Sequence, residues 1–263
     1  MKTFGKIKAA TRQKMLQTGA AMLKKLEWLM ARYSPVGNHR FFEPTQFPWS
    51  KKLETNWLAM RRELDQILEH QNNLPLFHDI SEDQKTISKD EKWKTFFLYG
   101  FGYKSEKNCA LCPETTRLIE SVPGMMTAFF SILGPGKHIP EHRGPFKGII
   151  RCHIGLKVPA PKELCRIRVD NETRFWEEGK SLIFDDSYYH EVWNDTSGTR
   201  VVLFLDLIRP LPFPLSLINK TIIKIISLSP LIQDARKNQA AWEEKFDQAA
   251  GQGRDRKALI EHA

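Results

Sequence analysis

The feature that most constrains the fold is a run of eight short strand-like segments between residues 126 and 207. Each segment is rich in β-branched and aromatic residues, and turns that contain Gly, Pro or Asn, such as Gly134-Pro-Gly136, separate it from the next. The connections are too short for the helical crossovers that a parallel sheet requires. The pattern therefore predicts an antiparallel barrel or jelly roll. The predicted strands are 126–133, 137–140, 148–157, 165–169, 173–176, 181–184, 189–193 and 200–207.

Helices are predicted before and between these strands. In residues 6–33, Met, Leu and Tyr recur at three- and four-residue steps, which is typical of an amphipathic helix. Ser50 is expected to cap a helix that runs to about residue 70. Pro113 is expected to open a short helix that ends near Ser121. We also expect a surface loop over residues 78–92 and a strand over residues 93–99.

The C-terminal segment is different in character. Residues 215–231 are very apolar and predict a helix on which Asn219, Lys220 and Lys224 share one face. This helix fits either a membrane interface, which we favour, or docking on the strand-rich core. A polar helix is expected around residues 235–246. The chain thus divides into a basic amphipathic arm (1–35), a strand-rich domain (36–212) and an apolar helical tail (213–263).

The net charge of +9 is concentrated in the arm. Residues 1–33 carry eight Lys and Arg residues against the single acid Glu27, so this segment accounts for +7 of the total. Such an arm predicts an anionic partner, either phospholipid headgroups or nucleic acid. Because no nucleic-acid-binding module accompanies it, we expect no nucleic-acid partner and favour an anionic membrane surface. Packing of the arm against the domain is the structural alternative.

The four cysteines are sparse for a chain of this size and predict a reducing compartment without disulfides. Cys109 and Cys112 form a Cys-x-x-Cys pair, but no second pair follows at zinc-site spacing. We interpret them as a chance match or a surface thiol pair. No signal-peptide pattern and no uncharged apolar stretch of about 18 residues is present, so neither a secretory leader nor a bilayer span is expected.

Two histidines, His142 and His190, stand 48 positions apart at the edges of strand-like runs. A jelly roll brings distant strand ends to one mouth, where neutral imidazoles suit Fe(II). Oxygenases usually add a carboxylate two residues after the first histidine, but here that position is Gly144. From spacing alone, a metal site and a pair of structural histidines both remain open.

Basic residues on two other strand-like runs call for an anion. Arg200 begins an apolar run, and a buried arginine there needs either a ligand carboxylate or an internal acid. Arg151 and His153 are two residues apart on another run, so they point to the same face. The internal acids available to pair with Arg200 are Asp185, Asp186 and Asp206.

The spacing of these residues resembles that of the aspartyl/asparaginyl β-hydroxylase family of Fe(II)/2-oxoglutarate dioxygenases. The resemblance spans about residues 126–210, and more loosely begins at Trp93. The matching residues are Pro135-Gly136-x-His138, His142-x-Gly144-Pro145, Arg151-x-His153-x-Gly155-Leu156, Asn171-Glu-Thr-Arg-x-Trp-Glu-Glu-Gly-Lys180, Phe184-Asp-Asp-Ser187, His190-Glu-Val-Trp193 and Arg200.

The resemblance implies a double-stranded β-helix, a cupin-like jelly roll with flanking helices. It implies that His142 and His190 alone hold the iron, with Gly144 where other oxygenases carry their acid. It further implies that Arg200 binds the distal carboxylate of 2-oxoglutarate, that Ser131, Arg151 and His153 make the other co-substrate contacts, and that O2 is the oxidant.

The substrate is predicted from the same resemblance. Ile149 stands where the animal peptide hydroxylases carry a substrate-binding arginine, and His138-Ile-Pro-Glu-His-Arg-Gly-Pro145 is more similar to the bacterial branch of lipid A and ornithine-lipid hydroxylases. We expect a lipid A 2-hydroxylase-like enzyme, cytoplasmic and peripheral on the inner face of the bacterial inner membrane. The alternatives are hydroxylation of an ornithine lipid, hydroxylation of Asp or Asn in a peptide or as the free amino acid, and a non-catalytic jelly roll that binds a ligand at the membrane.

Overall fold

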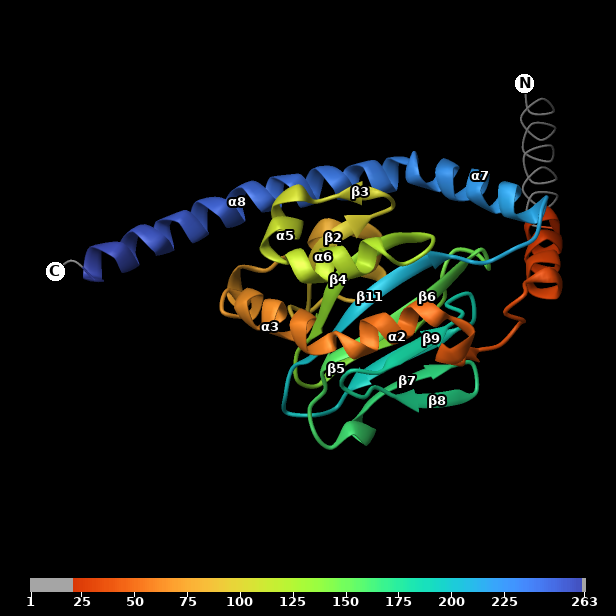
Figure 1. The fold of residues 1–263 in the computed structure, drawn as a ribbon, viewed down its shortest axis with the longest axis horizontal. Coiled ribbons are helices and arrows are strands. Elements are labelled where there is room, and N and C mark those ends of the chain that lie inside the picture. The colour runs from red at the N-terminus through yellow and green to blue at the C-terminus, as the bar shows by residue number, and fades with distance from the viewer. Residues whose placement is uncertain (1–20, 262–263) are drawn as a thin grey trace, which may run out of the picture.

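Two antiparallel sheets face each other at the centre of the structure, a computed structural model that describes residues 21–261 (Figure 1). In spatial order, the larger sheet contains β1 (Phe41–Phe42), β9 (Ser181–Phe184), β6 (Ile149–Lys157), β11 (Arg200–Ile208), β4 (Met125–Leu133), β2 (Trp93–Gly100) and β3 (Tyr103–Lys104). The smaller sheet contains β5 (Lys137–His142), β10 (His190–Asn194), β7 (Cys165–Val169) and β8 (Glu172–Phe175).

The chain crosses between the sheets again and again, which defines the topology. From β4 to β11 it alternates between the larger and the smaller sheet, with only β7 and β8 as consecutive neighbours in one sheet. The resulting orders, β9-β6-β11-β4 and β5-β10-β7-β8, are those of a double-stranded β-helix. The jelly-roll prediction is confirmed, and each of the eight predicted strands has its counterpart within about two residues at either end.

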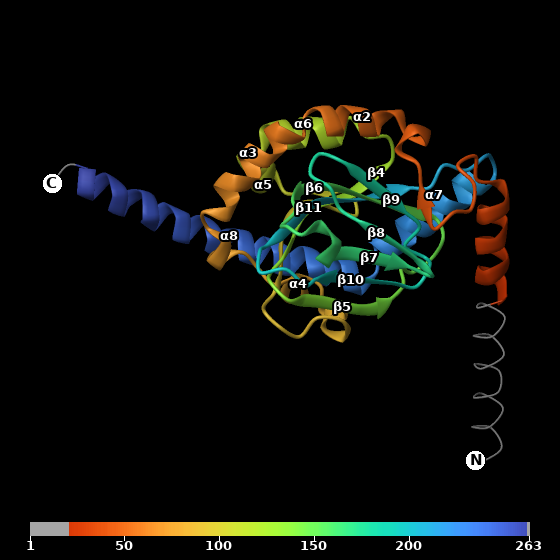
Figure 2. The ribbon, with the colours of Figure 1, turned by 90° about the horizontal axis from the view of Figure 1, so that it is seen from below.

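The two faces of the larger sheet pack against different parts of the molecule. On its outer face Phe96, Phe130 and Leu203 belong to the main hydrophobic core. There they are covered by α2 (Pro48–Thr55), α3 (Trp57–Leu68), α6 (Pro113–Glu120) and α8 (Pro230–Glu261), three of which form an arc over the sheet in Figure 2. On the inner face a second core, which includes Phe129 and Phe204, fills the space between the sheets. The inner face also carries the polar residues of the candidate site.

Several predicted helices differ from those observed. The predicted helix over residues 50–70 is two helices that break at Asn56, and Ser50 lies inside α2, where its hydroxyl donates to the carbonyl of Pro44. Pro48 opens α2 because its fixed φ suits a first helical turn. The predicted loop over 78–92 is not all loop, since it contains the end of α4. The described elements not predicted are the two-residue strands β1 and β3, the helices α4 (Phe77–Ile80) and α5 (Glu106–Leu111), and the 3-10 helices η1 (Pro44–Gln46), η2 (Gln71–Asn73), η3 (Glu82–Thr86) and η4 (Lys162–Leu164).

The cysteines are free and buried throughout. Cys109 lies in α5, and Cys112 directly precedes α6, both in the main core. The interpretation of this pair as surface thiols is therefore wrong, and burial raises the pKa of both thiols. The absence of a disulfide among the four residues agrees with the prediction.

The apolar tail is bent rather than straight. Helix α7 (Leu215–Ser227) ends before Pro230, which opens α8, because proline cannot continue the hydrogen-bond ladder of the preceding helix. Asn219 is fully buried and donates to the carbonyl of Gly148 at 2.8 Å, so the prediction that it shares the lysine face is wrong. Within residues 21–246, no single helix is long and apolar enough to cross a membrane. Helix α7 and the first part of α8 together have the length and the apolar composition of a membrane span, but they are bent by 56° relative to each other.

The described part of the basic arm is a helix over residues 21–33 that packs beside α7 (Figure 1). Met30 is fully buried in a third apolar cluster with Met126, Phe146, Ile149 and Ile223. The first part of the predicted arm lies outside the described residues.

Candidate active site

The two predicted histidines meet at the end of the smaller sheet. His142 ends β5 and His190 begins β10, directly opposite in register, and their ring centroids are 4.2 Å apart. Each Nδ1 lies 2.9 Å from the carbonyl oxygen two residues earlier, that of Pro140 and of Tyr188. A carbonyl only accepts, so each Nδ1 carries the proton that it donates, which leaves both Nε2 lone pairs available to a metal ion.

Burial keeps these imidazoles neutral. Removal from water lowers the pKa of His142, and it lowers that of His190 well below the ordinary value, because a buried cation loses its hydration. Neutral imidazole is the form that binds metals. No cluster of three His, Cys, Asp or Glu side chains that could hold a metal occurs among the described residues. The two neutral imidazoles, each with its Nε2 lone pair free, fit a metal held by two histidines, as the resemblance implies.

A glycine at position 144 is required by the packing. A Cβ there would lie 2.2 Å from Oδ2 of Asp186, so this position has no room for an acidic side chain. Asp186 is fully buried and its Oδ2 lies 3.0 Å from Nη2 of Arg151. Burial raises the pKa of Asp186 to about 7, partly offset by the Arg151 charge. The sequence did not show this carboxylate as the neighbour of Gly144, because the two lie 42 positions apart.

The deep end of the interior holds an unpaired cation. Arg200 is buried, with its guanidinium 4.4 Å from the Trp176 ring centroid. Its Nε and Nη1 have no hydrogen-bond partner among residues 21–261, and burial lowers its pKa to about 10. Within the described part of the chain, both ring nitrogens of buried His153 also lack hydrogen-bond partners. Unpartnered buried donors are costly, so this end fits a ligand that brings carboxylate oxygens.

The internal acids pair with cations other than Arg200. Arg151 donates through Nε to Oδ1 of Asp206 at 2.8 Å and also pairs with Asp186. Within the described part of the chain, none of the three candidate acids forms an ion pair with Arg200. The structure therefore does not contain the internal salt bridge that was the alternative partner for Arg200.

Strand register brings the predicted residues together in layers. Ser131 lies opposite Val202, and its hydroxyl accepts a hydrogen bond from Nε1 of Trp93 at 3.1 Å. One layer towards the mouth, Phe204 lies opposite His153. In the next layer, Asp206 lies opposite Arg151. The six predicted site residues thus come from β4, β5, β6, β10 and β11 and converge on the space between the sheets. A cavity of about 400 Å3 reaches this space, and His142, Arg151 and Asp186 are among its lining residues.

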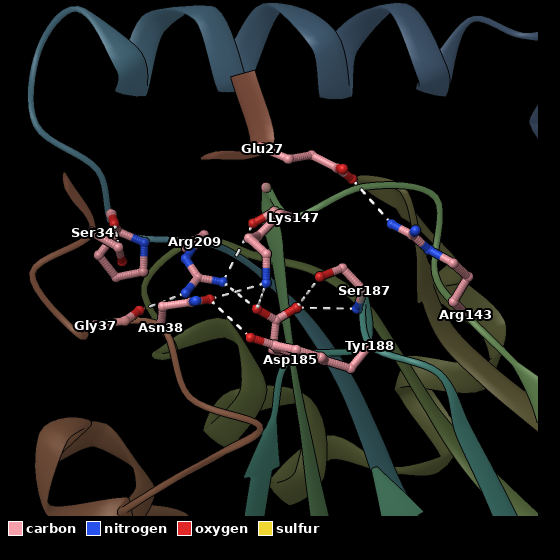
Figure 3. Close-up of polar contacts among 12 residues, drawn as sticks. Glu27, Ser34, Gly37, Asn38, Arg143, Lys147, Asp185, Ser187, Tyr188 and Arg209 are labelled. Carbon is pink, nitrogen blue, oxygen red and sulfur yellow. Dashed lines mark hydrogen bonds and ion pairs between the residues drawn. The ribbon is translucent and has the colours of Figure 1, made fainter. Parts of the chain in front are cut away.

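The turn before His190 is held from behind by an ion cluster that sequence reasoning missed (Figure 3). The buried carboxylate of Asp185 accepts hydrogen bonds from Lys147 and Arg209, both at 2.8 Å, and from the Ser187 hydroxyl. Arg209 also donates to the carbonyl of Gly37 at 2.6 Å. These contacts fix the segment that carries Asp186 and leads into His190. The signal in the sequence that could have pointed to this cluster is the acid pair Asp185-Asp186, which lies four to five residues before His190.

The fold and the site together define a double-stranded β-helix with a histidine pair at the end of the smaller sheet and buried basic residues in its interior. The family model for aspartyl/asparaginyl β-hydroxylase matches residues 54–210, and the chain belongs to this family of hydroxylases. The chain is 48% identical to the ornithine lipid ester-linked acyl 2-hydroxylase of Rhizobium tropici over 84% of this chain and 78% of that protein.

Other relatives are more distant. The chain is 39% identical to human aspartyl/asparaginyl β-hydroxylase over 61% of its own length, and it spans only 21% of that protein. Among solved structures, a prolyl-4-hydroxylase from Pseudomonas putida aligns with 59% of this chain and 88% of its own, at 15% identity and a TM-score of 0.38.

Proposed function

We propose that this protein is an Fe(II)- and 2-oxoglutarate-dependent dioxygenase that hydroxylates an acyl chain of a membrane lipid. The observation that carries the proposal is the histidine pair, because both Nδ1–H groups are held by backbone carbonyls and both Nε2 lone pairs remain for a metal ion. Family membership favours Fe(II), and when bound, the iron supplies the activation of O2.

The chain's own residues would bind and orient the co-substrate and exclude water. Arg200 would bind a carboxylate of 2-oxoglutarate with the N–H groups that lack partners, and Ser131 and His153 would add polar contacts. Arg151 would approach the co-substrate from the mouth side, while Asp206 and Asp186 hold its guanidinium in place. The aromatic side chains around this pocket exclude water from the reacting carbon.

An acyl substrate is favoured by the cavity and by one relative. Aromatic and aliphatic side chains make up much of the cavity wall beside His142. The relative from Rhizobium tropici is named for hydroxylation of an ornithine-lipid acyl chain at position 2, so we place ornithine lipid first. Lipid A, the substrate expected from the sequence, stays a prediction. Hydroxylation of Asp or Asn ranks below both lipids, because apolar Ile149 occupies the position where peptide hydroxylases have an arginine.

Peripheral attachment to the inner face of a bacterial inner membrane accompanies this proposal. It is supported by α7, which exposes Leu217, Ile225 and Leu228 next to Lys220 and Lys224. Apolar side chains flanked by cations suit the headgroup layer of an anionic membrane. The same helix buries its other face against the domain, so it also serves the fold.

The first test is metal-dependent turnover of 2-oxoglutarate by purified protein. We expect one bound Fe(II) and succinate formation, which His142→Ala or His190→Ala abolishes. His138→Ala is the matched control, because His138 lies on the same strand but is half exposed and contacts Glu191 outside the pocket. A protein that binds no iron, or a His142→Ala variant with full turnover, would contradict the proposal and favour a non-catalytic binding protein.

The second test identifies the substrate. Lipid extracts from cells with and without the gene are compared by mass spectrometry, and we expect loss of one oxygen from a lipid acyl chain when the gene is absent. An unchanged lipidome with intact succinate formation would transfer the assignment to the peptide or free amino-acid substrate.

A further inference from the structure

The cavity that reaches the histidine pair extends well beyond it. At one end it is lined by His142 and Asp186, and at the other by Leu231 and Ala235 at the junction of α7 and α8. Its volume of about 400 Å3 lies in the range of small-molecule sites, about 300–1,000 Å3. A co-substrate held between Arg200 and the histidines does not account for the part of the cavity that runs to the helices.

The floor of this cavity is a row of aromatic rings on the inner face of the larger sheet. Phe97, Phe129 and Phe204 lie directly opposite one another on the neighbouring strands β2, β4 and β11. Their rings stack with centroids 4.5 Å and 4.2 Å apart. The row ends where the Arg151 guanidinium lies 4.3 Å from the Phe204 ring. It therefore makes a continuous apolar path from β2 to the polar end of the site.

Helices from two distant parts of the chain form the opposite wall. Phe77 of α4 packs against Phe97 and Phe129, with ring centroids 5.9 Å and 5.4 Å apart. Asn238 of α8 donates to the carbonyl of Ile80 at 3.2 Å, which ties α8 to α4. The wall is built by packing rather than by a mobile loop, so it encloses a defined space over the aromatic row.

The far end of the cavity lies beside an exposed apolar surface of the tail. Ile225 is 65% exposed, Leu228 is 63% exposed and Leu231 is 45% exposed. Leu231 also lines the cavity, so this surface and the cavity are continuous. Lys224 stands on the same helix one residue before Ile225. An apolar path that begins at such a surface suits a lipid chain.

We propose that this cavity is an acyl channel, in which the substrate chain lies with its carbonyl end beside His142 and its methyl end towards Ala235. The inference rests on the proposed function and adds a specificity determinant to it. Ala235 and Phe97 set how long a chain the channel accepts. The orientation follows from the proposed reaction, because the carbon to be hydroxylated must lie beside the histidine pair, and Leu231 and Ala235 offer apolar contacts to the rest of the chain.

The test changes the channel at its far end. Ala235→Phe fills it, and Ala240→Phe is the matched control because Ala240 is an exposed alanine of the same helix that does not line the cavity. Binding to metal-free, full-length protein is measured with the fluorescent fatty acid cis-parinaric acid, displaced by dodecanoate or hexadecanoate. The acyl-length profile of hydroxylated lipid is measured separately with iron and 2-oxoglutarate present.

We expect Ala235→Phe to weaken hexadecanoate binding about tenfold while changing dodecanoate little, since each excluded methylene costs about fourfold, or ~0.8 kcal/mol. Phe97→Leu, which opens the channel, is expected to shift the product profile towards longer chains. Ala240→Phe is expected to match the wild type in both measurements.

The outcomes separate the channel from the activity. If wild-type protein hydroxylates a lipid but Ala235→Phe and Phe97→Leu leave chain-length preference and fatty-acid binding unchanged, the channel is wrong and the proposed function stands. If fatty-acid binding depends on Ala235 as expected but no lipid is hydroxylated, the channel stands as a binding site and the proposed function fails. A cooperative thermal transition in each variant confirms that it is folded.

Discussion

Two buried arginines mark the two ends of one strand, and their surroundings differ. Arg200 opens β11, and Arg209 follows its last residue. At Arg209 both terminal nitrogens are bound, by the Asp185 carboxylate and by backbone carbonyls. At Arg200 two of the three guanidinium nitrogens have no hydrogen-bond partner in the part of the chain that the structure describes, and the guanidinium lies beside the Trp176 ring and the Cys165 thiol.

The comparison separates scaffold from site. A buried cation paired with a buried carboxylate stabilises the native arrangement, and removal of one partner leaves the other charge buried without compensation. A buried cation without a carboxylate weakens the unliganded protein and is retained where a ligand supplies the anion. We therefore interpret Arg209 as a positioning residue for the turn before His190 and Arg200 as a ligand-binding residue.

The same substitution at both positions tests this contrast most strongly. Arg209→Met leaves Asp185 buried with one cation fewer and two backbone carbonyls without their donor. We expect the free energy of unfolding to fall by about 3–5 kcal/mol. Urea unfolding monitored by circular dichroism measures the change. A loss below about 1 kcal/mol would mean that Arg209 has no special structural role.

Arg200→Met should behave in the opposite way. We expect 2-oxoglutarate affinity to fall by about 2–5 kcal/mol through loss of a charge-assisted pair. Stability without ligand should be unchanged or higher, because a buried unpaired charge is replaced by an apolar side chain. Thermal melts with and without 2-oxoglutarate measure both effects, since a ligand that binds the native state raises Tm. A variant whose Tm still rises with 2-oxoglutarate as much as the wild type does would contradict the role.

A smaller change tests how much each of the two cations that contact Asp185 contributes to stability. Lys147→Met removes one of the two cations that contact Asp185 and keeps Arg209 (Figure 3). We expect a loss of about 1–3 kcal/mol in stability, less than for Arg209→Met, because Asp185 retains a charged donor. Parallel urea titrations of the two variants check the order, and a larger loss for Lys147→Met would reverse our assignment of the main partner.

The smallest expected effect is at the ring beneath Arg200. Trp176→Phe keeps an aromatic face but weakens its attraction for the guanidinium, which is about 0.5–2 kcal/mol for such pairs. We expect 2-oxoglutarate affinity to fall by less than tenfold, with maximal turnover unchanged. Succinate formation at varied 2-oxoglutarate concentration gives both values. A loss of turnover at saturating 2-oxoglutarate would show that Trp176 acts on the chemistry rather than on binding.

Much of the fold follows from local patterns. The eight strands occur at their predicted positions because runs of β-branched and aromatic residues and turns that contain Gly, Pro or Asn are local signals, which act within a few residues of each other. The break at Asn56 was not predicted, and neither was helix α4, which is tied to α8, far away in the chain, by the hydrogen bond from Asn238 to Ile80. Ser50 is a suitable capping residue, yet Pro48 starts the helix earlier.

The candidate site shows the same division. Its six predicted residues converge. They could be selected from the sequence because the motifs that contain them have fixed spacings along the chain. The partners of Arg151, the Asp185 cluster and the cavity wall were not predictable from spacing. Each joins residues from different strands or helices, such as Arg151 with Asp186 or Asn238 with Ile80.

By itself, the sequence determined the strand pattern, the paired histidines without an adjacent acid, and the basic residues that face the interior. Only the tertiary structure decided that Asp186 fills the space beside Gly144, that Asn219 is buried, and that Arg200 rather than Arg151 lacks a carboxylate partner. The reason is physical. Secondary structure depends on neighbours along the chain, whereas the desolvation and pairing of a charge depend on groups that only folding brings together.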